Sequence, residues 1–194
     1  MAFAPSDQPI PERLETDKFV FRPLRTADVS LDFDAVMESR EDLRELFQGS
    51  WPKDDFTLAD NLFDLTIHQK EHEQRKAYTF TIMDPSETIC LGCIYVTPLA
   101  AYLQNLDEAR ASQAKNADAA ICFWLRSSRL ADGLEAHVLH HLIDWLKNEW
   151  SFRHALLVVR ESATRQVALF KTVGLREAFR VAHPIDGPEF LFFE

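Results

Sequence analysis

The sequence is poor in glycine, cysteine and basic residues, and it has no long apolar run. Among 194 residues there are five glycines and three cysteines, and 31 acidic side chains outnumber 21 basic ones. Three cysteines do not make a disulfide framework, so we expect a reducing, cytoplasmic compartment. The net charge of −10 provides no cationic surface for nucleic-acid phosphates or anionic lipids, so neither a nucleic acid nor a membrane is an expected partner.

The first residues have neither the basic nor the apolar region of a secretory signal, and no run reaches the roughly 18 apolar residues that a membrane span needs. Pro5, Pro9 and Pro11 among scattered polar residues predict a flexible N-terminal arm over residues 1–16. Hydrophobic residues make up 46% of the chain, which is enough for one core. We therefore expect a single domain over residues 17–194.

Apolar periodicity predicts how helices and strands alternate in this domain. Residues 84–87 form a short turn, so the strands on either side of it should pair as a hairpin. Residues 99–117 have no clear period and are expected to form a surface excursion. The expected strands are 18–24, 77–83, 88–96, 119–125, 155–159, 179–181 and 190–193, and the expected helices lie within 29–47, 57–75, 133–150 and 162–174. Thr57, with Asp60, and Ser162 are expected to cap the helices that they begin. One apolar side is expected for each of two helices, Leu58, Leu62, Leu65 and Ile67 in the first, and Leu134, Val138, Leu142, Trp145 and Leu146 in the second. This order predicts an α/β (α+β) fold with a single mixed, mostly antiparallel central sheet flanked by helices on both faces.

Two segments carry a resemblance to a known family. The strand 119–125 ends in Cys-Phe-Trp-Leu, and after a loop Gly133 and Leu134 begin a helix. Small residues in such a loop let backbone N–H groups approach a pyrophosphate, and the helix dipole adds to the attraction. Residues 169–175 follow an apolar–aromatic–x–x–apolar–Gly pattern. With the order of elements, these segments resemble the GNAT superfamily of acyl-CoA N-acyltransferases, in particular the branch that acetylates the N-termini of ribosomal proteins.

The resemblance implies a GNAT-like fold and transfer of an acetyl group from acetyl-CoA, as co-substrate, to a primary amine. The acceptor would be a small cationic amine or a peptide N-terminus. The residues that match or flank the family's motifs, and that the resemblance assigns to acetyl-CoA, are Phe123, Trp124, Leu125, Arg126, Arg129, Gly133, Leu134 and Phe170.

Such a reaction needs a group that takes a proton from the ammonium, directly or through water. Three residues are candidates for catalysis. Asp118 lies on the same strand face as Ala120 and Cys122. Glu161 ends the following strand, and Tyr95 ends the hairpin strand. An ordinary surface or core role is the alternative for each of them.

The loop departs from the family pattern, and the departures keep other functions open. Leu130 stands where the family has arginine, and Asp132 and Glu135 place two carboxylates where a pyrophosphate would lie. Phe170 stands where a tyrosine often acts as an acid. These residues favour an alternative, a catalytically inactive binding or regulatory module of the same fold. A third hypothesis is a homodimer in which the hydrophobic strand 190–193 pairs with a partner edge.

Metal chemistry is not expected from this sequence. Cys90 and Cys93 lie within one strand and have no second pair. His68 and His72 are four residues apart, but the metalloprotease pattern is absent, so a solvated helix face is the favoured interpretation. Trp51 has two interpretations, a packed loop anchor or a wall of an acceptor pocket.

Charge is distributed unevenly along the chain. Residues 27–64 hold eleven acidic side chains against three basic ones, whereas residues 126–180 hold nine basic against six acidic. This division suits a cationic acceptor on one side and a phosphate-bearing donor on the other. A solvated pair of acidic helices is the alternative explanation.

Overall fold

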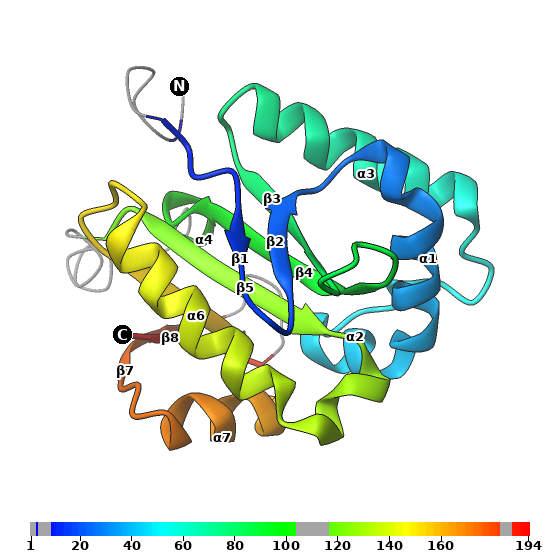
Figure 1. Ribbon diagram of the computed structural model, residues 1–194. Coiled ribbons are helices and arrows are strands. Elements are labelled where there is room, and N and C mark those ends of the chain that lie inside the picture. The colour runs from blue at the N-terminus through cyan, green and yellow to red at the C-terminus, as the bar shows by residue number, and fades with distance from the viewer. Residues whose placement is uncertain (1–2, 4–8, 104–116, 183–187) are drawn as a thin grey trace.

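The computed structural model describes residues 3, 9–103, 117–182 and 188–194. Over these residues the chain forms one eight-stranded sheet with helices on both faces (Figure 1). Of the neighbouring pairs only β5 and β6 are parallel, within the described part of the chain. The predicted fold class is therefore confirmed. The strands, in their order across the sheet, are β1 (Leu14–Glu15), β2 (Val20–Pro23), β3 (Tyr78–Met83), β4 (Cys90–Pro98), β5 (Ala119–Leu125), β6 (Ala155–Arg160), β8 (Phe190–Phe193) and β7 (Glu177–Val181).

The helices divide between the two faces of the sheet. Phe123 of β5 packs in the cluster that contains α6, whereas the neighbouring Trp124 packs in the cluster that contains α1 and α2. Among the described residues, no helix is long and apolar enough to cross a membrane. The helices are α1 (Val29–Glu38), α2 (Arg40–Phe47), α3 (Leu58–Glu73), α4 (Ala100–Leu103), α6 (Leu134–Asn148) and α7 (Thr164–Thr172), with short 3-10 turns η1 (Thr26–Asp28) and η2 (Ser127–Asp132).

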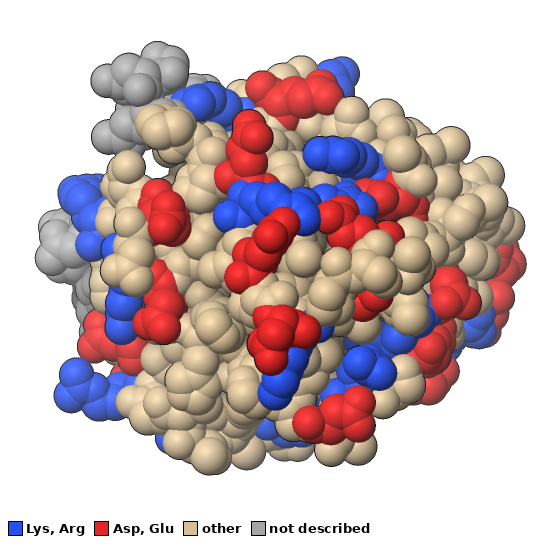
Figure 2. All heavy atoms as spheres, in the orientation of Figure 1, with Lys and Arg blue, Asp and Glu red and all other residues tan. Residues whose placement is uncertain are grey.

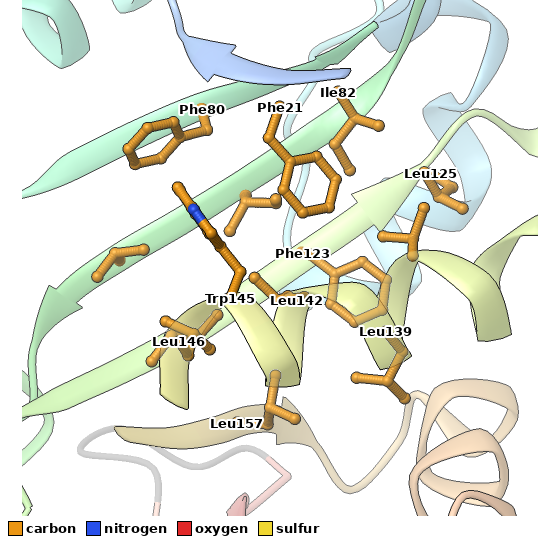
Figure 3. Close-up of a cluster of buried hydrophobic side chains, with 14 of the residues drawn as sticks. Phe21, Phe80, Ile82, Phe123, Leu125, Leu139, Leu142, Trp145, Leu146 and Leu157 are labelled. Carbon is orange, nitrogen blue, oxygen red and sulfur yellow. The ribbon is translucent and has the colours of Figure 1, made fainter. Parts of the chain in front are cut away.

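The largest core cluster fixes α6 against the sheet. Trp145 of α6 points toward the strands, between Phe21 and Phe80 (Figure 3), with ring centroids 5.7 Å and 4.9 Å away. Leu142 lies on the same buried side of the helix. Burying each such side chain stabilises the fold by about 1.5–3 kcal/mol. The predicted inner face of this helix is confirmed, and its packing sets where the loop after β5 lies.

Local signals placed most helix ends correctly. Thr57 caps α3 and forms a capping box with Asp60, as predicted. Gly174 has φ +89°, and its N–H and that of Leu175 bond back to the last turn of α7, as expected for this C-terminal motif. The expectation for Ser162 is wrong. Ala163 is the cap residue of α7, and the Ser162 hydroxyl has no hydrogen-bond partner among the described residues.

Regular structure begins before the expected boundary at residue 16. Leu14 and Glu15 form β1 and pair with β2, because the turn at Thr16 folds them back onto it. Farther upstream, Phe3 stacks on Phe152 at 5.2 Å between ring centroids. Part of the predicted arm therefore packs on the domain.

Two further expectations are corrected. Leu58, Leu62 and Ile67 of α3 are exposed rather than buried together, and only Leu65 of the predicted apolar side is in the core.

The strand 190–193 is β8, which lies between β6 and β7 and so has no free edge for a partner chain. Most of the predicted excursion over residues 99–117 lies outside the described residues, apart from α4 at its start.

Candidate functional site

The parallel strands β5 and β6 separate at their carboxyl ends. Their paired Cα positions stop at Ile121 and Leu157. From there β5 continues to Leu125 against β4, and β6 continues to Arg160 against β8. A gap therefore opens in the middle of the sheet, and both of its sides are strand edges.

The main chain of Phe123 faces this gap. Arg126 N–H donates to Leu91 O, and residues of an antiparallel ladder alternate between bonding toward the partner strand and away from it. Counting back along β5 from Arg126, Phe123 faces away from β4. Gln166 of α7 confirms this direction, because its side-chain Nε2 donates to Phe123 O at 2.9 Å.

A first pocket of about 320 Å³ lies at this gap. Burial raises the pKa values of Cys122 and Tyr102 to about 12, so both side chains stay protonated near neutral pH. Among the described residues, the pocket is therefore lined by neutral groups and a single arginine, and none of these residues is a carboxylate. Its described lining is Leu46, Phe47, Tyr95, Thr97, Tyr102, Cys122, Val158, Val159, Arg160 and Phe190.

A second pocket, also of about 320 Å³, adjoins the first and shares Phe47 and Tyr95 with it. Its chemistry differs because it contains two carboxylates and an imidazole. Its lining is Leu24, Asp32, Val36, Phe47, Trp51, Asn61, Asp64, Leu65, His68 and Tyr95.

Tyr95 lies where the two pockets meet. Trp124 Nε1 donates to the Tyr95 hydroxyl at 3.3 Å, which leaves the Tyr95 O–H free to donate. Burial raises the Tyr95 pKa well above its usual value, and nearby Cys93 adds to the shift. The Tyr95 hydroxyl therefore stays protonated near neutral pH.

Asp32 is the buried carboxylate of the second pocket and is 3% exposed. It accepts hydrogen bonds from Asn61 Nδ2 at 2.9 Å and from Cys93 Sγ at 3.5 Å. Burial raises its pKa, while the Asn61 bond opposes the shift. A buried carboxylate with few partners is stabilised when a cation lies beside it.

The loop after β5 is tied to the chain's own acidic helices. The Arg126 guanidinium, 10% exposed, pairs with Asp34 and with Glu38, the latter at 3.1 Å. Ser128 N–H donates to Glu38 at 3.1 Å, and the Ser127 hydroxyl donates to Asp42. Arg126, which the resemblance assigns to acetyl-CoA, is thus held by two ion pairs to carboxylates of α1.

The start of α6 carries charges of both signs. Gly133 has φ +70°, which turns the chain from η2 into the helix. Glu135 is buried and pairs with Arg165, and burial raises the Glu135 pKa although Arg165 opposes the shift. Arg129 pairs with Asp132 at 3.7 Å, and both are about half exposed. Figure 2 shows acidic and basic side chains interspersed over the face that carries α6.

The other cofactor candidates belong to the walls around the gap. Leu125 and Leu134 lie in the core cluster beneath α6. Phe170 of α7 stacks with Phe123 at 6.3 Å and meets Phe193 edge-on at 5.3 Å. Phe123, Phe170 and Phe193 therefore form an aromatic support behind the gap.

Asp118 and Glu161 lie outside the two pockets. Asp118 precedes β5, at the end opposite the gap, and accepts hydrogen bonds from the Arg153 main chain at 2.7 Å and from its guanidinium. It borders a separate hollow of about 560 Å³. Glu161 pairs with Arg180 at 3.2 Å and is about half exposed. These ion pairs join distant segments, which strand alternation does not reveal.

The structure places three further residues that the sequence analysis singled out. Trp51 lines the second pocket, and its Nε1 donates to Asp64 at 3.2 Å. His68 lines the same pocket, so the solvated-face interpretation is wrong for it. That interpretation also fails for His72, which packs against Tyr78 and Phe80. Within the described residues, no group of three or more His, Cys, Asp or Glu side chains is arranged to hold a metal ion.

Comparison with solved structures finds close matches to the whole fold. The ribosomal-protein-alanine acetyltransferase from Vibrio fischeri superposes with a TM-score of 0.67 at 14% identity, over 94% of this chain and 95% of that one. The chain has the fold of the GNAT acetyltransferases. RimL bound to coenzyme A gives a TM-score of 0.69 at 13% identity (94% and 96% covered), and MccE bound to acetyl-CoA and AMP gives 0.68 at 13% (92% of each). No protein-family model matches the sequence, and no curated protein does.

The two halves of acetyl-CoA fit this GNAT fold unequally. The gap between β5 and β6 offers an open strand edge and an adjoining neutral pocket, which suit an extended arm ending in a small acyl group. A buried oxygen of Gln166, Oε1, has no partner among the described residues and borders that edge. The pyrophosphate half fits less well, because Arg126 is engaged elsewhere and Asp132 lies at the helix start.

Proposed function

We propose that this protein transfers an acetyl group from acetyl-CoA to a primary amine. One observation carries the proposal: a neutral pocket at a gap between parallel strands meets an acidic, aromatic pocket at a single tyrosine, Tyr95. The neutral pocket suits an acyl thioester, and the acidic pocket suits a cation. The acceptor is either a small cationic amine or a peptide N-terminus.

The residues of the acidic pocket bind and deprotonate the amine. Asp32 and Asp64 attract the ammonium group, and the faces of Trp51 and Tyr95 complement its charge. His68, whose side chain is one-third exposed, accepts a proton and passes it to solvent. The amine nitrogen then has a free electron pair for attack.

Transfer joins the amine nitrogen to the acyl carbon and breaks the carbon–sulfur bond. The amine loses one proton, and the departing thiolate gains one, so the reaction needs no oxidant or reductant. Tyr95 keeps its proton before the reaction because its pKa is raised, and it donates that proton to the sulfur. The proton that the amine nitrogen loses on forming the amide then restores the Tyr95 hydroxyl. Asp118 and Glu161 have no part in this scheme, because ion pairs hold them outside both pockets.

Acetyl-CoA titration and an acetylation assay test this proposal. We expect calorimetric binding of acetyl-CoA and thiol release with a panel of primary amines. Tyr95→Phe should lower kcat about tenfold or more, in the range of general acid catalysis, and leave KM nearly unchanged. Tyr78→Phe is the matched control, because Tyr78 is a fully buried tyrosine outside both pockets.

A catalytically inactive binding module of the same fold is the second candidate. The engagement of Arg126 by Asp34 and Glu38, with Asp132 at the start of α6, favours it. No binding at millimolar acetyl-CoA and no product above the uncatalysed rate would overturn the first function and favour this second one.

A further inference from the structure

The neutral pocket contains a positive charge that the described residues do not neutralise. Arg160, the last residue of β6, is partly buried and lines this pocket. Its guanidinium forms no ion pair with a described residue, and its described hydrogen bond, from Nη1 to Pro188 O, is long at 3.4 Å. By contrast, Arg22 and Arg126, the buried arginines of the described part of the chain, both pair with carboxylates. A charge removed from water without a counter-charge is costly, so the state of Arg160 calls for an explanation.

The surroundings of Arg160 direct its charge toward the pocket. Phe190 lies opposite it on the paired strand β8, and the guanidinium carbon is 3.8 Å from the centroid of that ring. The ring therefore supports the guanidinium from one side. Burial lowers the pKa of Arg160, while nearby Tyr102 and Cys122 oppose the shift, and an arginine stays charged near neutral pH. Because Tyr102 and Cys122 stay protonated there, neither of them balances the charge.

The chemistry of this site matches a carboxylate. A guanidinium presents N–H donors in a planar fork that fits the two oxygens of a carboxylate. A carboxylate carries one negative charge, which one arginine neutralises, whereas a phosphate group carries nearly two. The pocket of about 320 Å³ is larger than an acetyl group needs, and its other lining residues suit a short carbon chain that ends in the charged group.

We propose that Arg160 binds a carboxylate that a substrate brings into the neutral pocket. The inference rests on the proposed function and extends it, because it adds a negative group to the substrates of the reaction. Two sources share this chemistry. The carboxylate is either the far end of the transferred acyl group, as in a succinyl thioester, or a part of the amine acceptor, as in an amino acid. In both cases the ammonium group binds in the acidic pocket, on the other side of Tyr95.

Matched pairs of substrates test the proposal and separate the two sources. In the donor arm, succinyl-CoA is compared with butyryl-CoA, which has a methyl group in place of the carboxylate, and butylamine is the acceptor. In the acceptor arm, acetyl-CoA is the donor. Glycine, β-alanine and γ-aminobutyrate are each compared with the amine that has a methyl group in place of the carboxylate. We expect one arm to show a kcat/KM about tenfold or more higher for the carboxylate, in the range of a charge-assisted hydrogen bond. That arm identifies the source.

Variants of Arg160 show whether this side chain causes the preference. Arg160→Met removes the charge and keeps a long apolar side chain, so the two members of each pair should react within about twofold of each other. Arg160→Lys keeps the charge but loses the planar fork, so it should lower the preference about threefold or more, and it serves if Arg160→Met folds poorly. Arg153→Met is the matched control, because Arg153 is an exposed arginine that pairs with Asp118 outside the neutral pocket. This control should keep the full preference.

The failures of the two proposals are distinguishable. If neither arm prefers the carboxylate while acetyl-CoA still reacts with an amine, the role of Arg160 is refuted and the proposed function stands. A preference that survives unchanged in Arg160→Met and Arg160→Lys refutes the role of Arg160 as well. Absence of any thioester turnover refutes the proposed function, and this inference with it.

Discussion

Replacing Gly92 by alanine should be among the most destabilising small changes in this sheet. Gly92 has φ +152°, and a Cβ there would lie 2.0 Å from Trp124 O. The β4 register against β3 shifts at this point, so Gly92 sits in a bulge that lets β4 approach β5 closely. The strained backbone would cost about 1–3 kcal/mol, and forcing packed strands apart about as much again.

The expected loss is therefore about 2–6 kcal/mol, a large part of the roughly 5–15 kcal/mol that holds a typical domain folded. At about 2–4 °C per kcal/mol, Tm should fall by roughly 4–24 °C. Urea unfolding followed by tryptophan fluorescence measures the free energy directly. Trp124 would move with β5, so its hydrogen bond to Tyr95 should weaken too.

Gly133→Ala is the matched control. Gly133 also has a positive φ, +70°, but a Cβ there would have no atom within 4 Å. Only backbone strain of about 1–2 kcal/mol should remain. If Gly92→Ala lost no more stability than Gly133→Ala, the close approach of β4 and β5 would not be the cause, and the reasoning would fail.

Three further changes test the charges of the molecule. Asp28→Asn should lower the free energy of unfolding by about 2–4 kcal/mol, because it leaves the buried Arg22 guanidinium with Glu87 as its remaining carboxylate. Urea unfolding measures this loss, and an unchanged urea midpoint would contradict it. Asp132→Asn should lower the Kd of CoA about two- to fivefold, measured by calorimetry, because it removes a negative charge at the start of α6. A higher Kd would argue against phosphates at that position. Because the pKa of Asp32 is raised, its carboxyl binds a proton more tightly in the folded protein than in the unfolded chain. The free energy of unfolding therefore falls as pH rises from the ordinary Asp pKa through the raised one. Unfolding at several pH values should therefore show Asp32→Asn gaining stability relative to the parent from about pH 4 toward pH 7, and a constant difference would refute the burial argument.

Local patterns predicted the elements around the site but not the side-chain partners within it. The cap at Thr57 and the glycine after α7 depend on contacts within a few residues, so their sequences were sufficient. Arg126 was assigned to acetyl-CoA because it flanks a motif of the family. The structure shows that it also pairs with Asp34, 92 residues earlier, and no local pattern reports such a contact.

The acidic pocket was only partly visible in the sequence. The excess of carboxylates over residues 27–64 indicated a cationic acceptor, and Trp51 was one of the residues singled out. Asp32 and His68 were missed because they lie on different helices and meet only when α1 and α3 pack together.

The sequence by itself determined the order of elements, the inner face of α6 and the likeness to the GNAT fold, because periodic burial and helix capping are short-range effects. Only the tertiary structure decided where β5 and β6 separate, that β8 lies inside the sheet, and that Tyr95 borders two pockets of opposite character. These features depend on contacts between distant segments, where packing and charge pairing select one arrangement among many that local preferences allow.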